Sequence, residues 1–385
     1  MTCYLITNTY FNDRDKERFG VDFFLNKGIK VKVIDVQDYT NPELYKSAKP
    51  LYKNENNLDV SVCANFYDFQ NAISFNEDSF AILFLSENYQ SIKIRRFLKV
   101  KNMQRGILHA GMLPSLQDNS GFFLKVKSKI EKYSFSHFTK LVVERLYGKF
   151  FDCKDYDFLI TSNYDTSNEN YKINSNKTIV ETHCLDYDLA LKSKSNKKLV
   201  DGKYVVFLDQ NLLHHTDFIR EKVKLNIQKD KYYEQLNTLF EKIENQFGFR
   251  VVIAAHPRAN IDEYHVLFKN RDIIHGNTVT LVRDCQFCIT HYSTAVNFAV
   301  IYNKPILFVT SNQLTTQDID KYIQLFSNIL NQIKINLSAS YELPEVFDVN
   351  KESFQNYKLK YIKKNNIEMT TWEIFYEQYL LKEFN

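Results

Sequence analysis

The chain has 385 residues, of which 44% are apolar and 25% charged, so a folded protein of two domains is expected and a disordered chain is excluded. A net charge of +4 excludes the strong basic imbalance of a dedicated nucleic-acid binder. No apolar run approaches the roughly 20 residues that span a bilayer, and the first residues resemble a strand rather than a signal peptide, so we expect a cytoplasmic protein.

The first half of the chain alternates strand and helix patterns, which predicts a parallel α/β sheet. Strands are predicted at 2–9, 29–35, 79–85, 158–161 and 178–183, and helices at 13–26 and 138–146. Asp35 ends the second strand, where dinucleotide-binding folds place an acid that binds ribose. The loop after the first strand lacks a G-x-G-x-x-G sequence, so a classical NAD site is excluded.

A basic stretch follows the third strand. Its cations are Lys93, Arg95, Arg96, Lys99, Lys101 and Arg105, interleaved with Phe97, Leu98, Val100 and Met103. The pattern fits a solvated helix face, and it also fits a surface helix that contacts anionic lipid. A histidine between glycines and apolar residues, His109, comes directly afterwards.

A polar and basic segment, 192–202, is the expected domain boundary. It separates an acceptor-binding domain at 1–195 from a nucleotide-sugar domain at 203–345, with a helical tail at 346–385. The second half predicts strands at 204–208, 250–255, 273–275, 286–290 and 306–309, and helices at 233–247, 295–302 and 372–381. Cys285 and Cys288 are expected to be reduced and buried, on opposite faces of a strand.

Polar residues stand at the ends of these strands, where open α/β sheets bind ligands. They are Asp209 and Gln210 after the first strand, His256, Pro257 and Arg258 after the second, Gly276 after the third, and His291, Ser293 and Thr294 after the fourth. Arg258 suits a phosphate because its planar fork reaches two oxygens, and His256 can donate a proton to a leaving phosphate. Ser293 and Thr294 precede a buried helix, whose start favours an anion; the alternative is an ordinary helix cap.

This pattern resembles the bacterial GT-B glycosyltransferases of capsule and lipopolysaccharide synthesis, such as sialyltransferases, polysialyltransferases and Kdo transferases. The matching positions are His256-Pro257, Ser293-Thr294 and Lys304-Pro305, and the likeness covers roughly residues 203 to 310. Similar elements recur in the glycerol-phosphate and ribitol-phosphate polymerases of teichoic acid synthesis. The resemblance implies an α/β protein with two Rossmann-like domains facing a cleft, in which His256, Ser293 and Thr294 contact the donor phosphate.

The family's general base is an acidic residue of the N-terminal domain, and this chain departs from that pattern. His109 and Asp209 are the candidates for the base. The implied reaction is inverting and metal-independent, without a cofactor. It transfers a sugar, favoured as a nonulosonic acid or Kdo from a CMP-activated donor, to a glycan or lipid-linked acceptor, with peripheral contact at the inner membrane.

Three other hypotheses stay open. A teichoic-acid-type phosphotransferase would use a CDP-alditol donor in the same architecture, and a non-catalytic α/β protein would merely hold a phosphorylated ligand. The metal-dependent GT-A fold is the third, because three D-x-D sequences occur. They are Asp155/Asp157, Asp186/Asp188 and Asp318/Asp320, and only the second follows a predicted strand.

Overall fold

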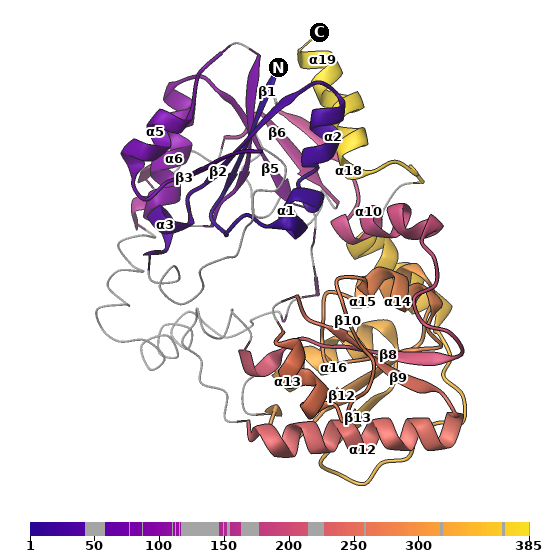
Figure 1. Ribbon diagram of the computed structural model, residues 1–385. Coiled ribbons are helices and arrows are strands. Elements are labelled where there is room, and N and C mark those ends of the chain that lie inside the picture. The colour runs from indigo at the N-terminus through magenta and orange to yellow at the C-terminus, as the bar shows by residue number, and fades with distance from the viewer. Residues whose placement is uncertain are drawn as a thin grey trace. The chain divides into compact units, whose positions relative to one another are not determined.

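The computed structural model describes residues 1–42, 58–76, 78–86, 88–109, 111, 113–114, 116, 146–148, 150–151, 155–162, 177–214, 227–257, 259–315, 319–363 and 366–384 (Figure 1). The chain forms two compact units. Unit 1 comprises Met1–Ala110, Gln117–Thr182 and Thr370–Asn385, and unit 2 comprises Gly111–Leu116 and His183–Met369. All but the last residue of the helix predicted at 138–146 lies outside the described residues.

Unit 1 contains a seven-stranded parallel sheet in the order β3-β2-β1-β4-β5-β6-β7. Its strands are β1 (Thr2–Thr7), β2 (Lys30–Asp35), β3 (Asp59–Val62), β4 (Ser79–Phe84), β5 (Gln104–His109), β6 (Phe158–Thr161) and β7 (Thr178–Glu181). Its helices are α1 (Asp13–Arg18), α2 (Val21–Asn26), α3 (Gln37–Thr40), α5 (Phe66–Ala72), α6 (Tyr89–Val100), α18 (Thr371–Phe375), the π-helical η5 (Tyr376–Leu380) and α19 (Leu381–Glu383).

Side chains alternate across this sheet, so each face receives its own set of helices (Figure 1). Ala81 of β4 belongs to a cluster with Phe69 of α5 and Leu98 of α6. The neighbouring Phe80 faces the other way and contacts Phe24 of α2 and Phe375 of α18. The strands are therefore apolar on both sides, as expected for a parallel sheet covered by helices on both faces.

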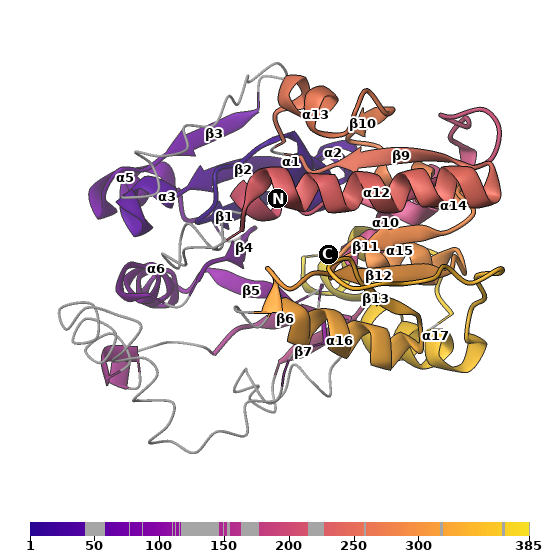
Figure 2. The ribbon, with the colours of Figure 1, turned by 90° about the horizontal axis from the view of Figure 1, so that it is seen from below.

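Unit 2 contains a six-stranded parallel sheet in the order β10-β9-β8-β11-β12-β13. Its strands are β8 (Tyr204–Leu208), β9 (Arg250–Ala255), β10 (Ile273–His275), β11 (Cys288–Thr290), β12 (Ile306–Thr310) and β13 (Lys334–Asn336). The helices include α10 (Leu185–Lys192), α12 (Lys229–Phe247), α13 (Ile261–Leu267), α14 (Thr278–Asp284), α15 (Val296–Ile301), α16 (Ile319–Leu330) and α17 (Lys351–Tyr357). Figure 2 shows the long α12 running beside β9. Counted within the unit, the strand order is 3-2-1-4-5-6, that of a Rossmann fold.

The division between the units differs from the predicted boundary at 192–202. The chain enters unit 2 at His183 and returns to unit 1 at Thr370, so residues 346–385 are not a separate tail. Hydrogen bonds keep the polar segment, predicted as a linker, within unit 2. The guanidinium group of Arg283 donates to the carbonyl oxygens of Ser193 and Asn196, at 2.5 and 2.9 Å, and holds the polar segment against α14.

Two local predictions need correction. The single helix predicted at 13–26 is two helices, because Gly20 adopts a left-handed φ of 68° and packs against Trp372. Cys285 lies before β11 rather than within it, so its sulfur is 3.8 Å from that of Cys288 instead of on the opposite face. Among the described helices, none combines the length and apolar content needed to cross a bilayer.

Candidate functional site

The candidate site of unit 2 lies at the carboxyl ends of β8, β9 and β11. Because β8 and β11 are neighbours but are not consecutive in the chain, the strand order reverses between them. Ligands of open α/β sheets bind at such a switch point. The structure therefore brings three of the predicted segments to one sheet edge: Asp209-Gln210, His256-Pro257 and His291 to Thr294.

Asp209 anchors the segment that follows β9. Its carboxylate accepts hydrogen bonds from the backbone N–H groups of Asn211 (3.0 Å) and His256 (3.2 Å) and from Tyr264 Oη (2.8 Å). Burial raises the pKa of Asp209, and these donors oppose that rise. Since the carboxylate is buried and supplied with donors, its geometry suits holding His256 in place better than accepting a proton from a substrate.

His291 is a buried structural residue of this edge. It is 0% exposed, its Nδ1–H donates to the Val309 carbonyl oxygen at 2.7 Å, and its Nε2 accepts from Tyr232 Oη at 2.9 Å. Burial lowers the pKa of His291 to about 4, so the ring is neutral near pH 7. The sequence suggested that His291 contacts the donor phosphate. The buried ring cannot do so, because both of its nitrogens are bonded within the protein. Tyr232 lies on α12, and the sequence around it does not predict its contact with His291.

Gln210 connects β8 to the segment after β11. Its Oε1 accepts from the backbone N–H of Tyr292 at 2.9 Å, and the side chain is buried. Ser293 Oγ accepts from the Ala295 N–H at 3.2 Å, which closes a local turn before α15. It is not the helix cap of the alternative prediction, because the N-cap residue of α15 is Ala295 and no side chain caps that helix. The Thr294 side chain is exposed to solvent, so it is the more available hydroxyl of the pair.

The segment after β9 is a closed turn. The Ala259 N–H donates to the His256 carbonyl oxygen at 2.9 Å, and the His256 side chain is half-buried. His275, at the end of β10, donates from Nε2 to the Pro257 carbonyl oxygen at 3.0 Å. The next residue, Gly276, has a left-handed φ of 82° that turns the chain away. Arg258 lies outside the described residues.

His109 lies in unit 1, at the carboxyl end of β5. Its ring is half-buried, and burial lowers its pKa below the ordinary value of 6.5. The imidazole is therefore neutral near pH 7 and chemically able to accept a proton. The two candidates for the base, His109 and Asp209, belong to different units.

The D-x-D carboxylates within the described residues are engaged by other groups of the protein, and Asp157 accepts from the backbone N–H of Arg105. Asp155 pairs with Arg105, Asp186 accepts from Asn297, and Asp188 lies 2.6 Å from His183 Nε2. Asp318 lies outside the described residues. Where the structure is described, no group of three or more His, Cys, Asp or Glu side chains could hold a metal ion. The two separate parallel sheets contradict the GT-A hypothesis.

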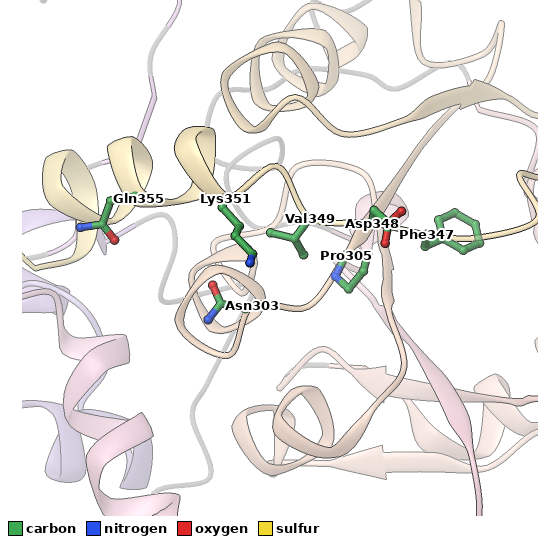
Figure 3. A pocket seen from close by; sticks show the side chains of 7 residues that line it. All are labelled: Asn303, Pro305, Phe347, Asp348, Val349, Lys351 and Gln355. Atoms are coloured by element: carbon green, nitrogen blue, oxygen red, sulfur yellow. The ribbon is translucent and has the colours of Figure 1, made fainter.

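A cavity of about 660 Å³ lies elsewhere in unit 2 (Figure 3). It is lined by Asn303, Pro305, Phe347, Asp348, Val349, Lys351 and Gln355. Pro305 immediately precedes β12, so the cavity is at the amino-terminal edge of the sheet, opposite to the candidate site. None of the predicted site residues lines it.

Comparison with known proteins identifies the fold. No protein-family model matches the chain, and no curated protein matches it in sequence. Among solved structures, the wall teichoic acid polymerase TagF is 14% identical, with 100% of this chain and 88% of that chain covered at a TM-score of 0.52. The glycotransferase of kitacinnamycin is 8% identical, with 98% of both chains covered at a TM-score of 0.50. At these identities the likeness shows the fold alone, which is the GT-B type with two Rossmann-like domains.

Proposed function

We propose that the protein is a glycosyltransferase that uses a nucleotide-sugar donor. The observation that carries the proposal is the convergence of His256-Pro257 and Ser293-Thr294 at the switch point of unit 2, held there by Asp209 and Gln210. The fold supports it, because one of the solved structures described above is by name a glycotransferase and the other a wall teichoic acid polymerase. Because many functions share one fold, the function is inferred from the residues of the site.

The donor phosphate is the ligand that this edge suits. His256 would donate a hydrogen bond or a proton to the leaving phosphate, and Thr294 would add a hydroxyl donor. Arg258 would pair with two phosphate oxygens, since its guanidinium group is planar and always charged. Fixed donors aimed at the charge that develops on the phosphate are the largest expected contribution to the rate.

His109 is the favoured general base, because it is half-buried and neutral near pH 7, whereas the buried Asp209 carboxylate already accepts hydrogen bonds from Tyr264 and from two backbone N–H groups. It would take the proton of the acceptor hydroxyl as that oxygen forms the new glycosidic bond. The bond between the sugar and the phosphate breaks on the opposite face, and the nucleotide leaves with its electron pair. This single displacement inverts the sugar carbon and requires no metal ion in the proposal.

The donor is favoured as a CMP-activated nonulosonic acid or Kdo, on the resemblance of His256-Pro257 and Ser293-Thr294 to the corresponding motifs. The acceptor is proposed to be a glycan or a lipid-linked glycan of a surface polysaccharide. A second candidate is transfer of an alditol phosphate from a CDP donor, which the likeness to a teichoic acid polymerase favours. A third is a phospholigand-binding protein without catalysis.

The test is nucleotide release. The purified protein is incubated with CMP-, CDP-, UDP- and GDP-activated donors, with and without a glycan acceptor, and the released nucleotide is measured. Release of CMP from a sugar donor supports the main proposal. Release of CMP from a CDP-alditol, with the alditol phosphate transferred, supports the second candidate. Binding of a nucleotide without any release would overturn both enzymatic proposals and leave the third.

A further inference from the structure

A short helical segment of unit 1, residues 146–148 and 150–151, packs against α6. Tyr147 contacts Tyr89 with ring centroids 4.6 Å apart, and Phe151 contacts Tyr147 at 4.7 Å. A side chain built at Gly148 would lie 3.6 Å from Ile92 Cδ1, which shows how closely this segment approaches α6. One side of the segment is therefore fixed on the helix that carries the basic sequence.

The other side of this segment is apolar and open to solvent. Leu146 is 53% exposed and Phe150 is 72% exposed. They are four residues apart, so they lie on the same side of a helical turn. A protein that leaves a phenylalanine this exposed beside a second large apolar side chain has a surface suited to an apolar partner.

Cations flank the apolar pair. Arg96 lies over the ring of Phe151 at 5.3 Å, and Lys93 lies over the ring of Tyr89 at 4.6 Å. Lys99 pairs with Asp155 at 2.6 Å, so that charge is balanced. The surface made by Leu146, Phe150, Lys93 and Arg96, here called the aromatic-basic surface, therefore has a positive net charge.

We propose that the aromatic-basic surface docks on an anionic lipid bilayer. Apolar side chains that project between cations match the bilayer interface, where Phe and Leu enter the acyl boundary while Lys and Arg remain at the headgroups. The rings beneath Lys93 and Arg96 hold both cations beside the projecting apolar residues. This inference does not depend on the proposed function, because it concerns binding to lipid and not transfer.

The experiment measures binding of the full chain to two kinds of vesicle by flotation. One kind is phosphatidylcholine, and the other is equal parts of phosphatidylcholine and phosphatidylglycerol. We expect binding to the anionic vesicles only, and weaker binding as salt is raised. Arg96→Ala should weaken binding about fivefold, the effect of one cation near an anionic surface. Phe150→Ala should weaken it about tenfold, since a Phe side chain leaves the interface.

Matched control variants lie on unit 2. Val266 is 79% exposed on α13, so Val266→Ala removes an exposed apolar side chain elsewhere, and Lys231→Ala removes an exposed cation of α12. Neither should change vesicle binding. Equal binding to neutral vesicles, no binding at all, or equal effects of test and control variants would overturn the proposal. Self-association that Phe150→Ala abolishes, without vesicle binding, would instead assign the surface to a second copy of the chain.

Discussion

Three histidines of the predicted site differ in burial, and their burial separates their roles. His291 is enclosed, neutral and bonded through both ring nitrogens, which suits a residue that fixes the end of β11. His256 and His109 are half-buried at the carboxyl ends of β9 and β5. Only a side chain that reaches solvent can meet a substrate, so the proposed mechanism assigns its chemistry to the latter two.

Replacement of His256 tests the donor side of the proposal. His256→Ala should reduce transfer about 10²–10⁴-fold, because a positioned proton donor contributes about that much. The fold should persist, since the backbone N–H that Asp209 holds is still present. Rates are measured by nucleotide release and folding by circular dichroism. His265 is exposed on α13, so His265→Ala is the control and should retain activity. Full activity of His256→Ala would remove this residue from the mechanism.

The pH profile tests His109. Burial lowers its pKa below 6.5, so the neutral base is present above that pKa and is lost as pH falls through it. The kcat/KM of the wild type should therefore be level near pH 7 and fall on the acid side, below pH 6.5. His109→Gln should lower kcat/KM about 10²–10⁴-fold and remove this acid limb. If the limb persists in His109→Gln, another group is the base.

At the scale of elements, α10 is joined to the helix that follows the Ser293-Thr294 turn. Asn297 of α15 donates from Nδ2 to Asp186 Oδ2 at 2.8 Å, and it accepts from Tyr357 Oη at 3.0 Å through Oδ1. Its backbone N–H donates to the Thr294 carbonyl oxygen at 3.1 Å. Asp186 and Asn297 are both buried, so this pair fixes the position at which the turn enters α15.

An exchange of the two side chains tests that positioning role. Asn297→Asp places two buried carboxylates together and should raise the donor KM about tenfold or more, because repulsion displaces the turn. The double variant Asp186→Asn with Asn297→Asp restores the hydrogen bond between the two side chains with its direction reversed. The carboxylate at position 297 can still accept from Tyr357 Oη, so the double variant should recover the KM. Steady-state KM and kcat are measured for all variants. Asn237 is buried in α12 and bonds carbonyl oxygens, so Asn237→Asp is a control that should lower stability without raising KM.

No recovery in the double variant would show that the contact does not act through hydrogen bonding. A rise in KM for Asn237→Asp equal to that of Asn297→Asp would show that the effect is general destabilisation of unit 2. The exchange thus separates local positioning from loss of fold.

At the scale of the whole molecule, unit 1 is completed by the end of the chain. Trp372 donates from Nε1 to the Arg18 carbonyl oxygen at 2.9 Å and packs on Phe24. A side chain at Gly20 would come within 2.4 Å of Trp372 Cδ1. Helices α1 and α2 therefore pack against α18 and stabilise it, although they are far apart in the sequence.

This closure can be tested with two glycines. Gly20→Ala should destabilise unit 1 by about 2–4 kcal/mol, since it combines left-handed strain with a clash against Trp372. Gly28 also has a positive φ, 74°, but a side chain there meets nothing within 4 Å, so Gly28→Ala should cost only about 1 kcal/mol. Trp372 is the single Trp of the chain, so its fluorescence follows unfolding of unit 1. Equal losses for both variants would contradict the packing argument.

The sequence by itself determined the features that depend on neighbouring residues. Apolar runs predicted β8 and β9 correctly. The helix ends predicted at Gly248 and Asn303 were confirmed, since these residues have left-handed φ angles of 67° and 51°. The sequence also predicted the fold. It predicted that Asp209-Gln210, His256-Pro257 and His291 to Thr294 lie near one another, because the carboxyl ends of parallel strands share one sheet edge.

Only the tertiary structure decided which of those polar side chains are available. Asp209 and His291 are enclosed by Tyr264, Tyr232 and Val309, which come from other parts of unit 2. The break at Gly20 and the return of the chain to unit 1 likewise depend on Trp372, far along the sequence. Burial and partner choice are set by long-range contacts, and a local pattern of residues carries no information about which side chains will close over it.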